Sequence, residues 1–227
     1  MITPPLLSHR HLLGLDSRCT SGHASPCGRA QKICRHMRTP PFVNILLDRD
    51  GTLIQDRHYL ADPNGVRLLP GTVQGLQALT RAGCRLFIVT NQSGVARRYF
   101  SVSDFQAVQD RLEDELRGHG ISFSGHAVCF HGPADACTCR KPKTGLWTRL
   151  SKRYDLRPEE SLMIGDKTSD IEFARKAGLA GSILVRAQPV HGPEPQTRRK
   201  PGRHPSCIVA DLHAAGKWIL GQSSLDI

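Results

Sequence analysis

From residue 42 onward the sequence predicts an α/β protein of the Rossmann-like, three-layer kind, with a mainly parallel sheet covered by helices on both faces. Two observations support this prediction: short apolar runs alternate with amphipathic segments, and polar residues gather where the runs end. Such alternation is typical of parallel sheets, because each crossover connection places a helix on one face of the sheet. The strand-like runs are 43–47, 85–89, 127–130, 161–164 and 182–185.

Helices are predicted between these runs. Apolar residues recur every three or four positions within 72–82, 102–118, 144–154 and 168–177, which is the spacing of an amphipathic helix. A serine at 101 or 103 can cap the second helix, and the glycine at 178 ends the fourth.

The C-terminal part continues the same pattern after an interruption. Residues 187–205 are rich in Pro, Gly and Arg and predict a mobile loop. Residues 207–209 then predict a short strand, and Asp211 can cap a final helix that extends through Leu220.

The first 41 residues differ from the rest in composition. They are rich in Ser, His, Arg, Pro and Cys, contain one acidic residue, and lack helical or strand periodicity. We expect 1–41 to be a disordered tail or an over-extended start, with Met37 as the true first residue. An organelle transit peptide is a third interpretation. One folded domain is predicted over 42–222.

Charge and apolar content limit the function classes. The net charge is +11, but residues 42–188 carry 20 basic and 16 acidic residues, so most of the excess lies in the flanks. Nucleic acid is therefore not an expected partner, whereas a modest positive surplus suits an anionic small molecule. No apolar stretch approaches the ~18 residues of a membrane span. Without a secretory signal, the cysteines indicate a reducing compartment, and we expect a cytoplasmic protein.

Polar residues follow the ends of four predicted strands. The first strand leads directly into Asp48-Arg49-Asp50-Gly51-Thr52. One carboxylate placed there can attack a phosphorus atom while the other handles the proton of the leaving group. Because ligands of open α/β sheets bind at the carboxyl ends of strands, all four groups are expected to meet at one site. The later groups are Thr90-Asn91-Gln92, Lys141, and Gly165-Asp166-Lys167 with Asp170.

In this order and spacing the four groups resemble the four motifs of the haloacid dehalogenase superfamily, over about 43–186. The resemblance implies that Asp48 is the nucleophile, forming an aspartyl-phosphate, and that Asp50 is the general acid and base. It implies Mg²⁺ bound by Asp48, Asp166 and the backbone carbonyl of Asp50. Thr90 and Lys141 are then expected to hold the phosphoryl oxygens.

A short cysteine-rich segment after the third strand has the pattern of a zinc site. It reads Cys129-x-His131, then five residues, then Cys137-x-Cys139. Three thiolates and one imidazole complete a tetrahedral set that zinc favours, and with four protein ligands such a zinc ion is structural. The alternative is a pair of buried cysteines beside a surface histidine.

The zinc-type loop resembles a capless subgroup of the superfamily, which contains heptose bisphosphate and histidinol-phosphate phosphatases. Residues 90–100 and Tyr59 resemble the heptose type, whereas the five-residue gap resembles the histidinol-phosphate type. The resemblance implies hydrolysis of a sugar phosphate, and the leading expectation is conversion of D-glycero-D-manno-heptose 1,7-bisphosphate to the 1-phosphate. Histidinol phosphate is the alternative substrate; a nucleic-acid 3′-phosphatase and a non-catalytic zinc-stabilised binding protein are less favoured.

Three residues are candidates for binding the substrate beyond its reacting phosphate. Arg140 has a planar fork that suits hydroxyls or a second phosphate. Asn91 and Arg98 are further candidates, and Arg97 beside Arg98 can equally belong to an exposed charged turn. The sequence has no insertion large enough to form a separate cap domain. We also expect the protein to be a monomer.

Overall fold

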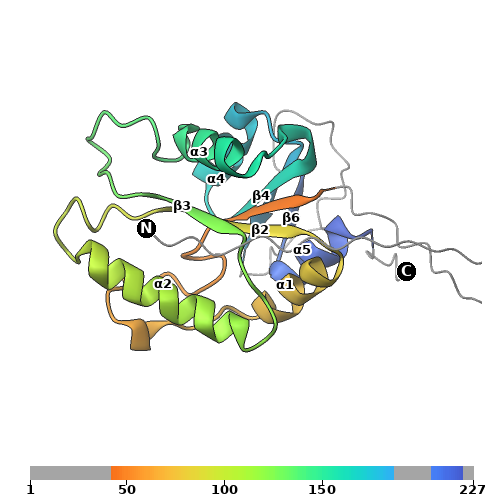
Figure 1. Ribbon diagram of the computed structural model, residues 1–227, viewed down its shortest axis with the longest axis horizontal. Coiled ribbons are helices and arrows are strands. Elements are labelled where there is room, and N and C mark those ends of the chain that lie inside the picture. Colours follow the sequence, from red (N-terminus) through yellow and green to blue (C-terminus); the bar gives the residue numbers. More distant parts are fainter. Residues whose placement is uncertain (1–41, 187–205, 222–227) are drawn as a thin grey trace, which may run out of the picture. The chain divides into compact units, whose positions relative to one another are not determined.

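The computed structural model describes residues 42–186 and 206–221, and in this part of the chain six strands form one parallel sheet (Figure 1). Their order across the sheet is β3-β2-β1-β4-β5-β6. The predicted α/β class is confirmed, and the strand at 207–209 also joins in parallel. The strands are β1 (Asn44–Leu47), β2 (Arg85–Asn91), β3 (Gly125–Cys129), β4 (Ser161–Gly165), β5 (Gly181–Val185) and β6 (Cys207–Val209).

Helices cover both faces of this sheet. Figure 1 shows α3 and α4 on one face and α1, α2 and α5 on the other. Short 3₁₀ turns at Pro63–Gly65 and Pro158–Glu160 complete the described elements. The α-helices are α1 (Thr72–Arg81), α2 (Val102–Arg117), α3 (Gly145–Tyr154), α4 (Thr168–Ala177) and α5 (Leu212–Ile219).

The helix ends follow the predicted local signals. Ser101 caps α2, since its Oγ accepts a hydrogen bond from Asp104 N and the Asp104 carboxylate accepts one from Ser101 N. Gly178 ends α4 in the left-handed conformation with φ of 70°. Asp211 caps α5 by accepting a hydrogen bond from Ala214 N.

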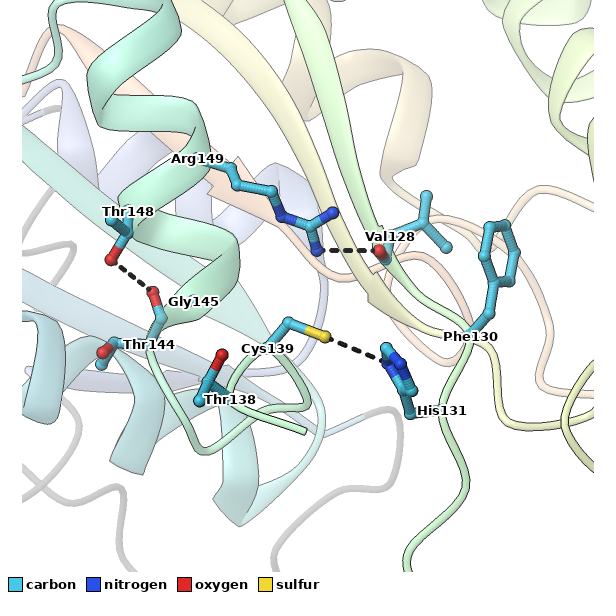
Figure 2. Close-up of a pocket in the computed structure, with 9 residues that line it drawn as sticks. All are labelled: Val128, Phe130, His131, Thr138, Cys139, Thr144, Gly145, Thr148 and Arg149. Carbon is cyan, nitrogen blue, oxygen red and sulfur yellow. Dashed lines mark hydrogen bonds between the residues drawn. The ribbon is translucent and has the colours of Figure 1, made fainter. Parts of the chain in front are cut away.

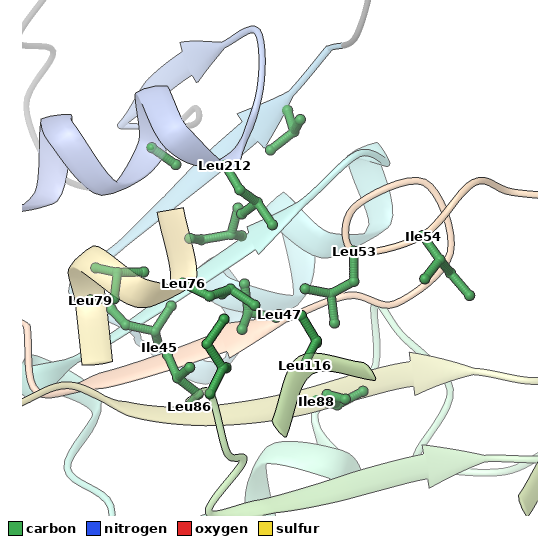
Figure 3. Packing of buried hydrophobic residues seen from close by; sticks show 14 of the residues in the cluster. Ile45, Leu47, Leu53, Ile54, Leu76, Leu79, Leu86, Ile88, Leu116 and Leu212 are labelled. Atoms are coloured by element: carbon green, nitrogen blue, oxygen red, sulfur yellow. The ribbon is translucent and has the colours of Figure 1, made fainter. Parts of the chain in front are cut away.

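Two apolar clusters hold the layers together, one on each face of the sheet. Ile45 and Leu47 of β1 point into the cluster with α1, α2 and α5 (Figure 3), while Leu46 points into the cluster with α3 and α4. All three side chains are fully buried. Each contributes about 1.5–3 kcal/mol by leaving water, so both faces stabilise the strand that leads into Asp48.

The strand order creates a switch point between β1 and β4, because the chain crosses over in opposite directions from these neighbours. Leu47 is in register with Ile164, and Asp48 N donates to Ile164 O. The loops after β1 and β4 therefore open side by side, which brings Asp48 and Asp166 together.

Two sequence-based predictions differ in their boundaries from the structure. β2 continues through Thr90 and Asn91, because Asn91 pairs with Cys129 of β3. β3 begins at Gly125 and ends before Phe130. The interpretations of 1–41 and the mobile loop at 187–205 lie outside the described residues. Within 42–186 and 206–221, no helix is both long enough and apolar enough to cross a membrane.

Candidate active site

The loop after β1 places Asp48 at the centre of the site. Asp48 is buried, and its Oδ1 accepts a hydrogen bond of 2.8 Å from Arg49 N. The next turn needs glycine at position 51, where φ is +86° and an added Cβ would lie 2.2 Å from Asp166 Oδ2. The Asp-Gly of this motif thus allows the loops after β1 and β4 to approach each other closely.

Lys141 reaches the same point from the loop after β3. Its Nζ lies 2.9 Å from Asp48 Oδ1, 2.6 Å from Asp170 Oδ1 and 2.7 Å from Val89 O. Burial alone would lower the pKa of Lys141, but Asp48 and Asp170 outweigh it and hold the pKa above its ordinary value. Lys141 is therefore a buried, charged ammonium group next to Asp48.

Three carboxylates meet here, and their geometry fits a cation. One oxygen each from Asp48, Asp166 and Asp170 lie within 4.8 Å of one another. Burial, followed by repulsion from Asp48, raises the pKa of Asp166 to about 6. Asp170 is occupied by Lys141 and by Lys167 N, which donates to its Oδ2. Asp48 and Asp166 are thus the pair suited to a hard, oxygen-preferring divalent ion.

Asp50 stands beside this cluster and is held from two sides. Arg49 Nε and Nη2 donate to its two oxygens, and Gln92 Nε2 donates to Oδ2 at 2.7 Å. The same Gln92 nitrogen donates to Thr90 Oγ1 at 2.9 Å. The sequence placed Arg49 and Gln92 within the motif groups but gave neither a role. The available signal for Arg49 was a charged residue between two acids, but the sequence does not show the direction of its side chain.

The four predicted zinc ligands come together as a second cluster, with one ligand atom of each within 4.8 Å of the others. Sγ of Cys139 lies 3.3 Å from Cys129 Sγ and 3.3 Å from His131 Nδ1, and Cys137 Sγ lies 3.9 Å from Cys129 Sγ. Figure 2 shows Cys139 and His131 facing each other beside an open hollow. Zn–S bonds of about 2.3 Å place tetrahedral sulfurs about 3.7 Å apart, so the set fits zinc.

The electrostatics of this second cluster also favour a metal. Burial, followed by the neighbouring Cys139, raises the pKa of Cys129 to about 12. The thiolate form is therefore costly at Cys129 unless a cation balances it. The hollow of Figure 2 is lined by His131 and Cys139 but by none of the three clustered carboxylates, so it is distinct from the site at Asp48.

The three candidates for substrate contact have different surroundings. Asn91 exchanges two hydrogen bonds with the backbone of Lys141, through Lys141 N and Lys141 O. Arg140 Nη1 donates to His131 O, and Arg98 is exposed with φ of 58°. Asn91 thus already positions Lys141; substrate contact by these three residues stays a prediction.

An exposed aromatic pair lies between the loops after β1 and β2. The rings of Tyr59 and Tyr99 meet edge to face with centroids 4.6 Å apart, and the Arg97 guanidinium lies 5.8 Å from the Tyr59 centroid. Tyr59 is 40% exposed and Tyr99 58% exposed. Exposed aromatic rings and a guanidinium group of this kind are available to contact a ligand.

Known proteins are similar in sequence to a large part of this chain. The HAD-hydrolase-like family model matches residues 138–215. The probable D-glycero-D-manno-heptose-1,7-bisphosphate 7-phosphatase of Thermoplasma volcanium is 39% identical over 141 residues, 62% of this chain and 97% of that protein. The D-glycero-beta-D-manno-heptose-1,7-bisphosphate 7-phosphatase of Haemophilus ducreyi is 36% identical over 149 residues, 63% of this chain and 82% of that protein.

Solved structures give the same relationship in three dimensions. The D,D-heptose 1,7-bisphosphate phosphatase of B. bronchiseptica, in complex with magnesium and phosphate, superposes with a TM-score of 0.68 at 31% identity. The match covers 79% of this chain and 99% of that one. The L-2-haloacid dehalogenase of Xanthobacter autotrophicus has a TM-score of 0.54 at 12% identity, which is a likeness of fold alone.

Proposed function

The chain belongs to the HAD-hydrolase-like family, and from this membership we propose that it is a Mg²⁺-dependent phosphatase that removes the 7-phosphate of D-glycero-D-manno-heptose 1,7-bisphosphate. The observation that carries the proposal is the meeting of Asp48, Asp166 and Lys141 at one point. A nucleophile, a second acid for a cation and a buried ammonium group are the parts that phosphoryl transfer needs.

Asp48 is the nucleophile of this proposal. Its carboxylate attacks the phosphorus atom of the 7-phosphate and forms an aspartyl-phosphate. Lys141 lies 2.9 Å from Asp48 Oδ1 before the reaction. As charge moves from the carboxylate to the phosphoryl group, the ammonium group follows it and stabilises the phosphoryl oxygens. Asp170 and Val89 O keep Lys141 in place during this exchange.

Asp50 serves as general acid and then as general base. It protonates the departing sugar oxygen and later accepts a proton from the water that hydrolyses the aspartyl-phosphate. Thr90 Oγ1 accepts a hydrogen bond from Gln92, which leaves its own proton to donate to a phosphoryl oxygen. Asp48, Asp166 and the carbonyl of Asp50 would hold Mg²⁺, which would supply the charge neutralisation that an anionic nucleophile needs to approach an anionic substrate.

Substrate selection falls to the loops around the open site. The exposed Tyr59–Tyr99 pair with Arg97 offers aromatic and cationic groups to a sugar phosphate, and Arg98, Arg140 and Asn91 remain proposed contacts to its hydroxyls or second phosphate. Histidinol phosphate is the less favoured substrate, since the relatives described above carry heptose bisphosphate names.

Zinc at the four-residue cluster, a monomeric state and a cytoplasmic location complete the proposal. Among the described cysteines, Cys84, Cys129, Cys137 and Cys139 form no disulfide. This suits a reducing compartment. The four residues would hold a structural zinc ion, which would fix the loop that delivers Arg140 and Lys141.

A substrate panel tests the proposed function. Phosphate release is measured as kcat/KM for heptose 1,7-bisphosphate, histidinol phosphate and a 3′-phosphorylated oligonucleotide, each with and without Mg²⁺. We expect the heptose bisphosphate to be the best substrate and activity to require the metal. A higher kcat/KM for histidinol phosphate would replace the substrate, and release from none of the three would reject the proposal.

A further inference from the structure

Arg49 lies between Asp48 and Asp50 in the first loop. It is the largest of the fully buried side chains in the described residues, with 1% exposure. Its guanidinium group faces both oxygens of the next residue. Nε donates to Asp50 Oδ2 at 3.1 Å and Nη2 donates to Oδ1 at 3.2 Å. A fork of two N–H groups on two carboxylate oxygens fixes both the position and the rotation of the carboxyl group.

The loop itself does not need this guanidinium group for its shape. Arg49 O accepts hydrogen bonds from Leu53 N at 2.9 Å and Ile54 N at 3.1 Å, and Gly51 N donates to Ile54 O at 2.8 Å. These bonds join main-chain atoms only, so the guanidinium group of Arg49 takes no part in closing the turn.

Apart from Asp50, the charge of Arg49 has an aromatic neighbour. Its Cζ atom lies 5.1 Å from the ring centroid of Phe105, itself 2% exposed, and such a cation–π contact is weaker than a buried ion pair with two hydrogen bonds. An apolar side chain would pack there at lower desolvation cost, because a buried charge must be balanced by a partner. In the described part of the chain, the carboxylate paired with Arg49 is that of Asp50.

We propose that Arg49 is a positioning residue that aims the Asp50 carboxyl group at the leaving-group oxygen. This inference rests on the proposed phosphatase function. As the Asp48–phosphorus bond forms, the bond from phosphorus to the sugar oxygen breaks and the Asp50 proton passes to that oxygen. Water then forms the new bond to phosphorus, the Asp48 bond breaks, and the water proton passes to Asp50. Arg49 touches no reacting atom and acts through Asp50.

Leaving groups of different basicity test this role. A sugar alkoxide needs a proton to depart, whereas p-nitrophenolate departs without one. The two substrates are heptose 1,7-bisphosphate and p-nitrophenyl phosphate, compared by kcat/KM, which ends at the departure of the leaving group and excludes the later hydrolysis. Arg49→Met removes the fork and its charge, and Arg49→Lys keeps a charge without the fork. Asp50→Asn is the positive control for loss of the acid.

We expect Arg49→Met to lower kcat/KM for the sugar phosphate by about 100-fold, within the range of general acid catalysis, and to lower it several-fold less for p-nitrophenyl phosphate. Arg49→Lys should show a smaller loss with the same selectivity. Adding Arg49→Met to Asp50→Asn should cost no more than Asp50→Asn alone. Thermal melts identify a variant that does not fold, and Arg49→Lys then carries the test.

Equal losses on both substrates, or no loss on either, would overturn the inference and assign Arg49 a structural role. Wild-type protein that releases phosphate from neither substrate would overturn the proposed function instead. The two failures are thus distinguishable within one experiment.

Discussion

The ammonium group of Lys141 lies 2.6 Å from Asp170 Oδ1, and both side chains are almost completely buried. Asp170 can approach this closely because Gly165 has no Cβ; an added Cβ would lie 2.3 Å from Asp170 Oδ2. Gly165 and Asp170 of the fourth motif therefore position Lys141 of the third motif. This contact explains why acids at positions 166 and 170 have different tasks.

Replacing Asp170 by asparagine should lower kcat while leaving the fold intact. The substitution keeps the size of the side chain but removes one of the two anions that orient Lys141. Loss of such a supporting partner typically costs about 10- to 100-fold in activity. Glu172→Gln on the same helix is a matched control, since Glu172 is exposed and pairs with Lys176. Steady-state kinetics of both variants check this, and an unchanged kcat for Asp170→Asn would remove Asp170 from the mechanism.

Mg²⁺ should stabilise the protein more at pH 8 than at pH 5. The pKa of Asp166 is raised from 3.8 to about 6 in the folded protein. This group therefore favours folding of the metal-free protein below pH 3.8, and that contribution is lost as the pH rises through about 6. Above that pH the ionised Asp166 binds the cation; below it, protons compete for the same oxygens.

Melting curves with and without Mg²⁺ at the two pH values measure this effect. Asp166→Asn is the control: it should melt higher than the wild type at pH 8 without metal and should not respond to Mg²⁺. A Mg²⁺ response of equal size in Asp166→Asn would place the ion elsewhere.

Gly51 and Gly83 offer a matched pair of substitutions. Both have positive φ, +86° and +84°, but an added Cβ at Gly51 would meet Asp166 Oδ2 at 2.2 Å, whereas Gly83 has nothing within 4 Å. Alanine at either position should cost about 1 kcal/mol of stability from the backbone. Gly51→Ala should in addition lose most activity and Mg²⁺ binding, measured by kinetics and calorimetry. Equal activity in the two variants would show that the loops after β1 and β4 can move apart without loss of function.

Cys139→Ser should remove zinc from the protein and reduce its stability. Cys139 Sγ lies within 3.3 Å of both Cys129 Sγ and His131 Nδ1, so its loss leaves three ligands. We expect about one zinc per wild-type chain by elemental analysis, and a lower melting temperature and kcat in the variant. Cys207→Ser, in β6 outside the cluster, should keep the metal. Zinc-free wild-type protein with a normal melting curve would reject the zinc site.

Much of this account could be predicted from the sequence, because the signals are local. The apolar runs predicted β1, β4 and β5 to within one residue at each end, and Ser101, Gly178 and Asp211 marked helix ends. The spacing of the cysteine-rich loop predicted four residues that the fold brings together. Each of these patterns is set by neighbours in the chain.

The contacts that were missed depend on side-chain directions between distant segments. Asn91 holds the backbone of Lys141, fifty residues away in the chain, and Gln92 reaches back to Asp50. The side chain of Arg49 contacts that of Asp50, the next residue. In an extended strand, successive side chains would point to opposite sides. Composition and periodicity carry no information on such directions. The end of β2 was missed for a related reason, since pairing with β3 extended the strand into polar residues.

Rapid acid quench of the reaction, followed by peptide mass spectrometry, determines whether Asp48 becomes phosphorylated during turnover. Asp50→Asn is used to slow hydrolysis of the intermediate, with p-nitrophenyl phosphate as the phosphoryl donor because its leaving group needs no proton. We predict that the peptide containing Asp48 gains the mass of one phosphoryl group on that residue, and that Asp48→Asn shows neither this gain nor phosphate release. Phosphate release by Asp48→Asn near the wild-type rate, or a phosphoryl group found on a different residue, would contradict the account.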